Sequence, residues 1–202
     1  MMSGTPATLA LLVSTVLVSL VAFSSRGVFD RFALHPYGIA RDGTWYQTIT
    51  SGFLHGDLAH LAFNMITLFF FGPFVESYLG TPAFLVVYFG SMLVGSLVAF
   101  FRRREQPQYR AIGASGAISG VLFSFVLMRP LQPIYIFLLP IGIPAAAFAV
   151  GYVLVSAFGM RRGVGRIGHE AHLGGAFAGL VLTLALDPAV LPHFLQQIRS
   201  GF

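Results

Sequence analysis

The chain alternates between apolar segments and shorter polar connections. The six apolar segments lie at 6–24, 58–79, 83–101, 111–128, 134–158 and 171–186. A helix needs about 20 predominantly apolar residues to cross the hydrocarbon core of a bilayer, and these segments are near that length. The pattern predicts an all-α polytopic membrane protein, with six transmembrane helices in one compact domain over residues 1–202. Because no basic residue precedes the first segment, we interpret it as a retained span and not as a signal peptide.

The fourth segment carries a serine between glycines, in the sequence GASGAISG at 113–120. If residues 111–114 form a loop, the helix that begins at Ser115 is about 21 Å long, too short to cross the bilayer core. Ser115 would then lie below the membrane surface at a helix N-terminus. Backbone N–H groups there are free to bind negative charge, and Gly113 and Gly116 let other backbone approach the hydroxyl.

Two other regions depart from simple spans. Residues 25–57 mix charged and aromatic side chains, which favours an interfacial structure partly in the headgroup layer; an ordered loop outside the membrane is the alternative. The fifth segment contains Pro140, Gly142 and Pro144, which predict a kinked, loosely packed helix. The glycine-rich loop after it, at 159–171, is a candidate lid.

Composition narrows the class. Hydrophobic residues make up 56% of the chain and charged residues only 9%, against roughly a quarter in soluble proteins. The basic side chains are twelve arginines with no lysine, which favours contact with lipid headgroups, and no motif for nucleic acid is present. Without cysteine there is neither a disulfide framework nor a thiolate nucleophile.

Polar residues gather at the starts of three segments. His60 and Asn64 share one helix face at the start of the second, Ser115 begins the fourth, and His172 begins the sixth. With six spans and simple connectivity, these starts lie on one side of the membrane. His172 can then accept the hydroxyl proton of Ser115, while Asn64, His60 and the Ser115 N–H donate to an oxyanion.

This constellation resembles the rhomboid family of intramembrane serine proteases over nearly the whole chain. The matching motifs are GASG at 113–116, the set His55, His60 and Asn64, EsyLG at 76–80, and AHLGG with its GxxxG pair at 171–179. The resemblance implies a rhomboid-like bundle that cleaves transmembrane segments of other proteins with a Ser115/His172 dyad, without a catalytic acid, metal or cofactor.

The same resemblance implies roles for further residues. The oxyanion site would include His60 and Asn64. The supporting residues would be Gly113, Gly116, His55, Gly175 and Gly179, with the last two also matching the small-residue spacing of closely packed membrane helices. By analogy, the fifth span and the loop after it would gate substrate access.

The chain departs from the family pattern at two places. The tryptophan and arginine pair of the first loop is replaced by Trp45 and Tyr46. Four residues after the serine, where many relatives carry an aromatic that packs on the catalytic imidazole, this chain has Ser119. His172 would then be less firmly held, or Ser119 would hydrogen-bond to it.

Several alternatives stay open. The glycines and serine of GASGAISG are also typical of plain helix packing. The sequence HEAH at 169–172 invites a zinc site, but it is one residue short of HExxH. A rhomboid-like protein that binds transmembrane helices without cleavage is the main rival, and a small transporter or channel is the third hypothesis. We interpret Glu76, near the far end of its span, as a structural hydrogen-bond partner.

The membrane orientation is ambiguous, while the expected location is a prokaryotic plasma membrane. Ten arginines lie in loops on the side of the candidate site, against Arg129 and Arg199 on the other. Arginine-rich short loops usually stay cytoplasmic. The resemblance implies the reverse, with both termini in the cytoplasm. Membrane lipids are expected partners in either orientation.

Overall fold

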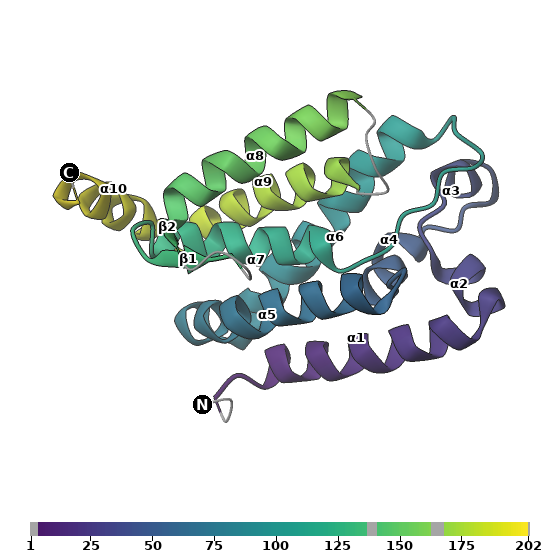
Figure 1. Ribbon diagram of the computed structural model, residues 1–202, viewed down its shortest axis with the longest axis horizontal. Coiled ribbons are helices and arrows are strands. Elements are labelled where there is room, and N and C mark those ends of the chain that lie inside the picture. The colour runs from purple at the N-terminus through teal and green to yellow at the C-terminus, as the bar shows by residue number, and fades with distance from the viewer. Residues whose placement is uncertain (1–3, 137–140, 163–167, 202) are drawn as a thin grey trace.

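The computed structural model describes residues 4–136, 141–162 and 168–201. Helices dominate this part of the chain, and one two-stranded hairpin interrupts them (Figure 1). The elements, in chain order, are α1 (Pro6–Ser24), α2 (Arg26–Phe32), α3 (Pro36–Asp42), α4 (Gln47–Thr50), the 3-10 helix η1 (Ser51–Phe53), α5 (Leu58–Leu79), α6 (Thr81–Arg103), α7 (Ser115–Met128), β1 (Pro133–Tyr135), β2 (Gly142–Pro144), α8 (Ala145–Arg162), α9 (His169–Leu186) and α10 (Val190–Ser200).

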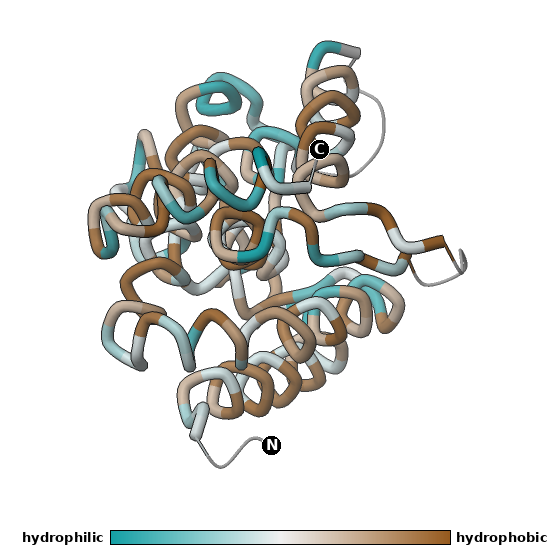
Figure 2. Tube along the Cα trace, turned by 90° about the vertical axis from the view of Figure 1, so that its left-hand side faces the viewer, coloured by the Kyte–Doolittle hydropathy of each residue, from teal (hydrophilic) through white to brown (hydrophobic). Residues whose placement is uncertain are grey.

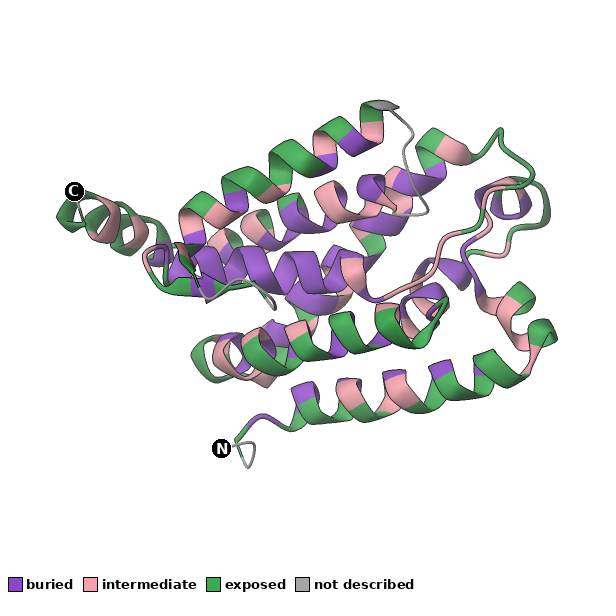
Figure 3. Ribbon diagram, viewed as in Figure 1, coloured by how far each residue is buried: buried purple, intermediate pink, exposed green. Residues whose placement is uncertain are grey.

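The short helix α7 forms the centre of the bundle. It contacts α5, α6, α8 and α9, and every residue from Gly116 to Met128 is buried. In Figure 3, α7 is purple along almost its whole length, whereas α1, α5 and α8 show green outward faces. A helix that is apolar all round requires such a position, because it has no polar face to present to water.

The outer helices expose apolar side chains. Leu17, Phe70 and Val155 are each more than half exposed, and hydrophobic segments run along the peripheral helices in the end-on view of Figure 2. Hydrocarbon tolerates such faces, whereas charged side chains within it are costly. The prediction of an all-α polytopic membrane protein is therefore confirmed.

The number of spans stays a prediction. In the described part of the chain, α1, α5 and α6 are long and apolar enough to cross a membrane. A fourth span results if α9 and α10, bent by 110° at a short break, are counted together. α7 and α8 are apolar but shorter. Six crossings would thus require that short helices also traverse the bilayer.

The predicted fifth span was wrong in its first part. Residues 133–135 and 142–144 form an antiparallel hairpin in which Ile134 pairs with Ile143, and the helix begins only at Ala145. Pro144 therefore precedes α8 and does not kink it, because proline fits just ahead of a helix, where no N–H partner is required. Pro140 lies outside the described residues.

Glycines bring α7 and α9 into close contact. A Cβ atom at Gly175 would collide with the Gly116 backbone, and one at Gly179 with the Gly120 backbone. These pairs recur every four residues on both helices, so the two backbones pack along matching glycine faces. The GxxxG pair predicted a close helix approach, and its partner is α7. This contact fixes the register between the helices that carry Ser115 and His172.

Glu76 ties α1 to α5, as the structural interpretation of this residue expected. Its carboxylate accepts hydrogen bonds from the backbone N–H groups of Ala7 (2.9 Å) and Thr8 (2.7 Å), and from the hydroxyls of Thr8 (2.7 Å) and Thr81 (2.8 Å). N–H groups in the first turn of a helix have no partner within it, so a carboxylate from another helix completes the start of α1.

The region 25–57 is an ordered structure packed on α6. The Trp45 ring lies 5.0 Å from that of Phe100, and the Ser96 hydroxyl donates to the Thr48 carbonyl at 2.9 Å. Tyr46, at the position where the family's arginine was expected, donates through its hydroxyl to a backbone carbonyl of α2 at 3.2 Å. The partial embedding of the region 25–57 in the headgroup layer stays a prediction.

Candidate active site

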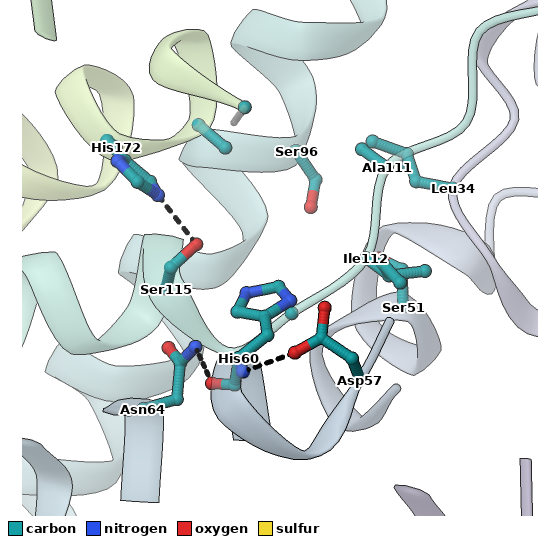
Figure 4. Close-up of a pocket in the computed structure, with 13 residues that line it drawn as sticks. Leu34, Ser51, Asp57, His60, Asn64, Ser96, Ala111, Ile112, Ser115 and His172 are labelled. Carbon is teal, nitrogen blue, oxygen red and sulfur yellow. Dashed lines mark hydrogen bonds between the residues drawn. The ribbon is translucent and has the colours of Figure 1, made fainter. Parts of the chain in front are cut away.

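Ser115 and His172 meet between α7 and α9. The Ser115 Oγ lies 2.8 Å from the His172 Nε2, within hydrogen-bond distance (Figure 4). Ser115 is the first residue of α7, and His172 lies in the first turn of α9. Gly116 follows Ser115 directly, and Gly175 lies about one turn after His172; these two glycines allow the helices to approach closely enough for the side chains to touch.

A cavity of about 420 Å³ opens beside this pair. His60 and Asn64, from the first two turns of α5, line it together with Ser115 and His172 (Figure 4). The Asn64 amide nitrogen donates to the His60 carbonyl at 2.9 Å. An amide nitrogen carries two hydrogens, so the second stays available to a group in the cavity. The structure thus brings together all four residues predicted to share one depth.

The backbone ahead of the serine turns sharply at Gly113. Its φ of +114° is unfavourable for residues with a side chain, and a Cβ there would lie 2.8 Å from the His60 ring. Both observations require glycine at this position. The turn directs the chain into α7, whose first N–H groups have no partner within the helix.

His55 is hydrogen-bonded to the same turn through the backbone of Ala114. Its Nε2 accepts a hydrogen bond from the Ala114 N–H at 3.4 Å, and its Nδ1 lies 2.9 Å from the Ser19 Oγ. Because Nε2 accepts, the hydrogen of the neutral ring is on Nδ1. Burial, with the neighbouring His60 as a second cause, lowers the pKa of His55 to about 4. The ring is therefore neutral at pH 7 and connects α1 to the residue before Ser115.

Ser119 does not hydrogen-bond to His172 as one prediction had it. Its hydroxyl lies 2.6 Å from the Ser115 carbonyl and 2.5 Å from the Tyr152 hydroxyl. The Tyr152 ring, from α8, stacks beside the His172 imidazole with 6.0 Å between centroids and 27° between planes. An aromatic thus lies against the imidazole, from a different helix than expected. Sequence reasoning missed Tyr152, because a tyrosine in an apolar segment carries no spacing signal.

An ion pair anchors the start of α9. The Arg103 Nε donates to the Glu170 carboxylate at 2.6 Å, and the same guanidinium makes a second contact with it. Glu170 is buried and stands two residues before His172. A carboxylate in the first turn of a helix is stabilised by the macrodipole. Arg103 was expected to contact lipid headgroups and Glu170 to end a lid; the pairing of the two was missed.

Two further expectations concern metals and the lid. Across 4–136, 141–162 and 168–201, no three His, Cys, Asp or Glu side chains group as a metal site. The centre of the candidate lid, residues 163–167, lies outside the described residues.

The fold defines a helical polytopic membrane protein, and comparison with known proteins identifies the particular family. The rhomboid domain model matches residues 42–188. The chain therefore belongs to the rhomboid family.

Three relatives illustrate the similarity. "Putative rhomboid protease YdcA" of Bacillus subtilis is 38% identical over 99 residues, 49% of this chain and 48% of that protein. "Rhomboid protease GluP" of Bacillus subtilis is 30% identical over 170 residues, 84% of this chain and 32% of that protein. "Rhomboid protein 1, mitochondrial" of Saccharomyces cerevisiae is 32% identical over 156 residues, 76% of this chain and 45% of that protein. The chain thus spans a third to a half of the length of these relatives.

Proposed function

We propose that this chain is an intramembrane serine endopeptidase that hydrolyses peptide bonds in or near transmembrane segments of other membrane proteins. The observation that carries the proposal is the 2.8 Å contact between the Ser115 Oγ and the His172 Nε2 at the edge of a cavity. A serine hydroxyl is a weak nucleophile until a base takes its proton, and this contact supplies the base. The relatives named as rhomboid proteases support the same reaction class.

The residues at the site can carry each step of the hydrolysis, with water as the second reactant. The Ser115 Oγ attacks the carbonyl carbon of the substrate while its proton passes to the His172 Nε2. The oxyanion accepts hydrogen bonds from the Asn64 amide, the His60 ring and the Ser115 backbone N–H. His172 then protonates the leaving amine, and the acyl group stays on Ser115. A water gives a proton to His172 as it attacks the ester, and His172 returns that proton to the Ser115 Oγ as the bond to the acyl group breaks and the carboxylic acid product leaves.

In this proposal no acidic side chain assists the dyad. Glu170, two residues before His172, is engaged with Arg103 and not with the imidazole. The supporting residues are Gly113 and His55, which shape the turn before the serine. Gly116, Gly175 and Gly179 support the site as well, because they let α7 and α9 approach.

The outer surface of the bundle is apolar, so the bundle lies in the membrane, and the cavity is part of this bundle. We therefore propose transmembrane proteins as the substrates. We further propose that the enzyme crosses the membrane with six spans, and that this membrane is a prokaryotic plasma membrane whose lipids surround the bundle.

Incubation of the purified protein with a panel of transmembrane peptides tests the function. Wild type should cleave at least one peptide, and Ser115→Ala and His172→Ala should each abolish cleavage. Ser77→Ala and His193→Ala are matched controls: Ser77 is an exposed serine near the end of α5 and His193 is exposed on α10, and neither lines the cavity. Cleavage that survives both dyad substitutions would refute the mechanism. Peptide binding without any cleavage would favour the rival, a rhomboid-like protein that only binds helices.

A further inference from the structure

Tyr152 touches the imidazole of the candidate dyad from outside the two helices that carry it. Its ring stacks beside that of His172, with 27° between the planes. On its other sides it packs against Phe123 of α7, at 5.6 Å between centroids, and Phe148 of its own helix, at 6.2 Å. Its hydroxyl lies 2.5 Å from that of Ser119. Contacts on several sides therefore hold the tyrosine ring in place.

Small residues on one face of α8 bring Tyr152 to this position. Ala145, Ala149, Ser156 and Gly159 are buried, at the three- and four-residue spacing of a single helix face that also contains Tyr152. At Gly159 a Cβ would collide with the His169 ring of α9. The absence of bulk on this face lets α8 lie close to α9, and Tyr152 is the large side chain that fills the gap beside His172.

We propose that Tyr152, held by Ser119, is a positioning residue that keeps the His172 imidazole aimed at Ser115. This inference rests on the proposed function of the dyad. The second side-chain torsion of a histidine is broad, so the ring rotates easily unless a neighbour restricts it. In many serine hydrolases a carboxylate restricts the ring through its second nitrogen. Here the nearby Glu170 is engaged with Arg103, and the flat face of Tyr152 restricts the ring by contact.

The link also returns to the helix of the nucleophile. Ser119 lies one turn after Ser115, and its hydroxyl bonds to the Ser115 carbonyl at 2.6 Å as well as meeting Tyr152. One connected set of contacts therefore joins Ser115 on α7, Tyr152 on α8 and His172 on α9. A displacement of α8 removes the stack, so the imidazole is aimed correctly only while α8 is docked.

The first test is kinetic. We expect Tyr152→Leu to lower kcat by about 10- to 100-fold with little change in KM, because a misaimed base slows proton transfer and not substrate binding. Tyr152→Phe retains the stack and should lose less, about threefold, because only the hydroxyl contact with Ser119 is missing. Phe177→Leu on α9 is the matched control, since that ring is 65% exposed and should leave kcat unchanged.

The second test reads the imidazole itself. In a Ser115→Ala background, nitrogen-15 NMR of His172 should show one sharp ring environment with Tyr152 and a broadened or shifted one with Tyr152→Leu. Should the leucine variant fail to fold, Tyr152→Phe and Ser119→Ala serve in its place, each expected to lower kcat about threefold and to alter its pH profile. Wild-type kcat, pH profile and His172 spectrum in the folded Tyr152 variants would overturn the inference.

These tests separate the inference from the proposed function. If wild type cleaves and Ser115→Ala does not, while the Tyr152 variants match wild type, only the positioning role fails. If Ser115→Ala cleaves like wild type, the dyad itself fails, and the NMR experiment still decides whether Tyr152 restrains the His172 ring.

Discussion

Replacement of Glu76 by glutamine should destabilise the bundle by detaching the start of α1. The two carboxylate oxygens accept four hydrogen bonds: Oε1 from the Ala7 N–H and the Thr81 hydroxyl, and Oε2 from the Thr8 N–H and hydroxyl. Glutamine keeps the shape but turns one acceptor into a donor. Whichever way the amide points, its NH₂ group faces one backbone N–H.

The size of the effect follows from that mismatch. The threonine hydroxyls can rotate and accept from the amide, whereas a backbone N–H cannot, and a buried donor left without a partner costs about 1–3 kcal/mol. Loss of the negative charge at the start of α1 removes about 0.3–1 kcal/mol more. The expected loss is therefore about 2–3 kcal/mol.

Thermal unfolding in a fixed detergent measures this loss. At roughly 2–4 °C per kcal/mol for a chain of this length, Glu76→Gln should lower Tm by about 4–12 °C. Glu105→Gln, which removes an exposed carboxylate after α6, should change Tm by less than about 2 °C. Equal Tm values for wild type and Glu76→Gln would refute the idea that Glu76 fastens α1 to α5.

Three further changes probe the site. Gly175→Ala adds a Cβ that would collide with the Gly116 backbone, so it should push α7 away from α9 and lower the rate of cleavage at least about 100-fold. Gly151→Ala adds a Cβ in open space on α8 and should leave cleavage unchanged. Between pH 6.5 and 4 the unfolded chain takes up a proton at His55 that the folded chain, with a pKa of about 4, does not. The free energy of unfolding of wild type should therefore fall, relative to that of His55→Gln, by up to about 3 kcal/mol over this range, which appears as a larger drop in Tm. Parallel Tm curves for the two proteins would contradict this. Arg103→Gln should lower the free energy of unfolding by about 3–5 kcal/mol, because Glu170 stays buried without its cation, and Tm should fall accordingly. Arg102→Gln, at an exposed position, should leave Tm unchanged.

Much of the bundle follows from local patterns in the sequence. Apolar length predicts α1, α5 and α6, and the change from glycine-rich loop to apolar run predicts a helix starting at Ser115. The four-residue spacing of Gly175 and Gly179 predicts a close helix contact. Alternating helix direction then brings the starts of three helices to one end, and the structure has their polar residues around one cavity.

Other features depend on contacts between distant residues. The segment at 134–144 is as apolar as a span, so hydropathy alone could not distinguish a hairpin from the first turns of a helix. Tyr152 meets Ser119 across 33 residues, and Arg103 meets Glu170 across 67. Neither pair leaves a periodic signal within its own helix, and only the packing of α8 and α9 on α7 brings the partners together.

The central claim is that His172 activates the hydroxyl of Ser115 toward acyl or phosphoryl electrophiles. Reaction with a fluorophosphonate, followed by mass spectrometry of the peptides, tests it most directly. We predict a single adduct on the Ser115 Oγ in wild type and in His193→Ala, and its loss in His172→Ala. An unmodified Ser115 in wild type, or an adduct of equal yield in His172→Ala, would contradict the account.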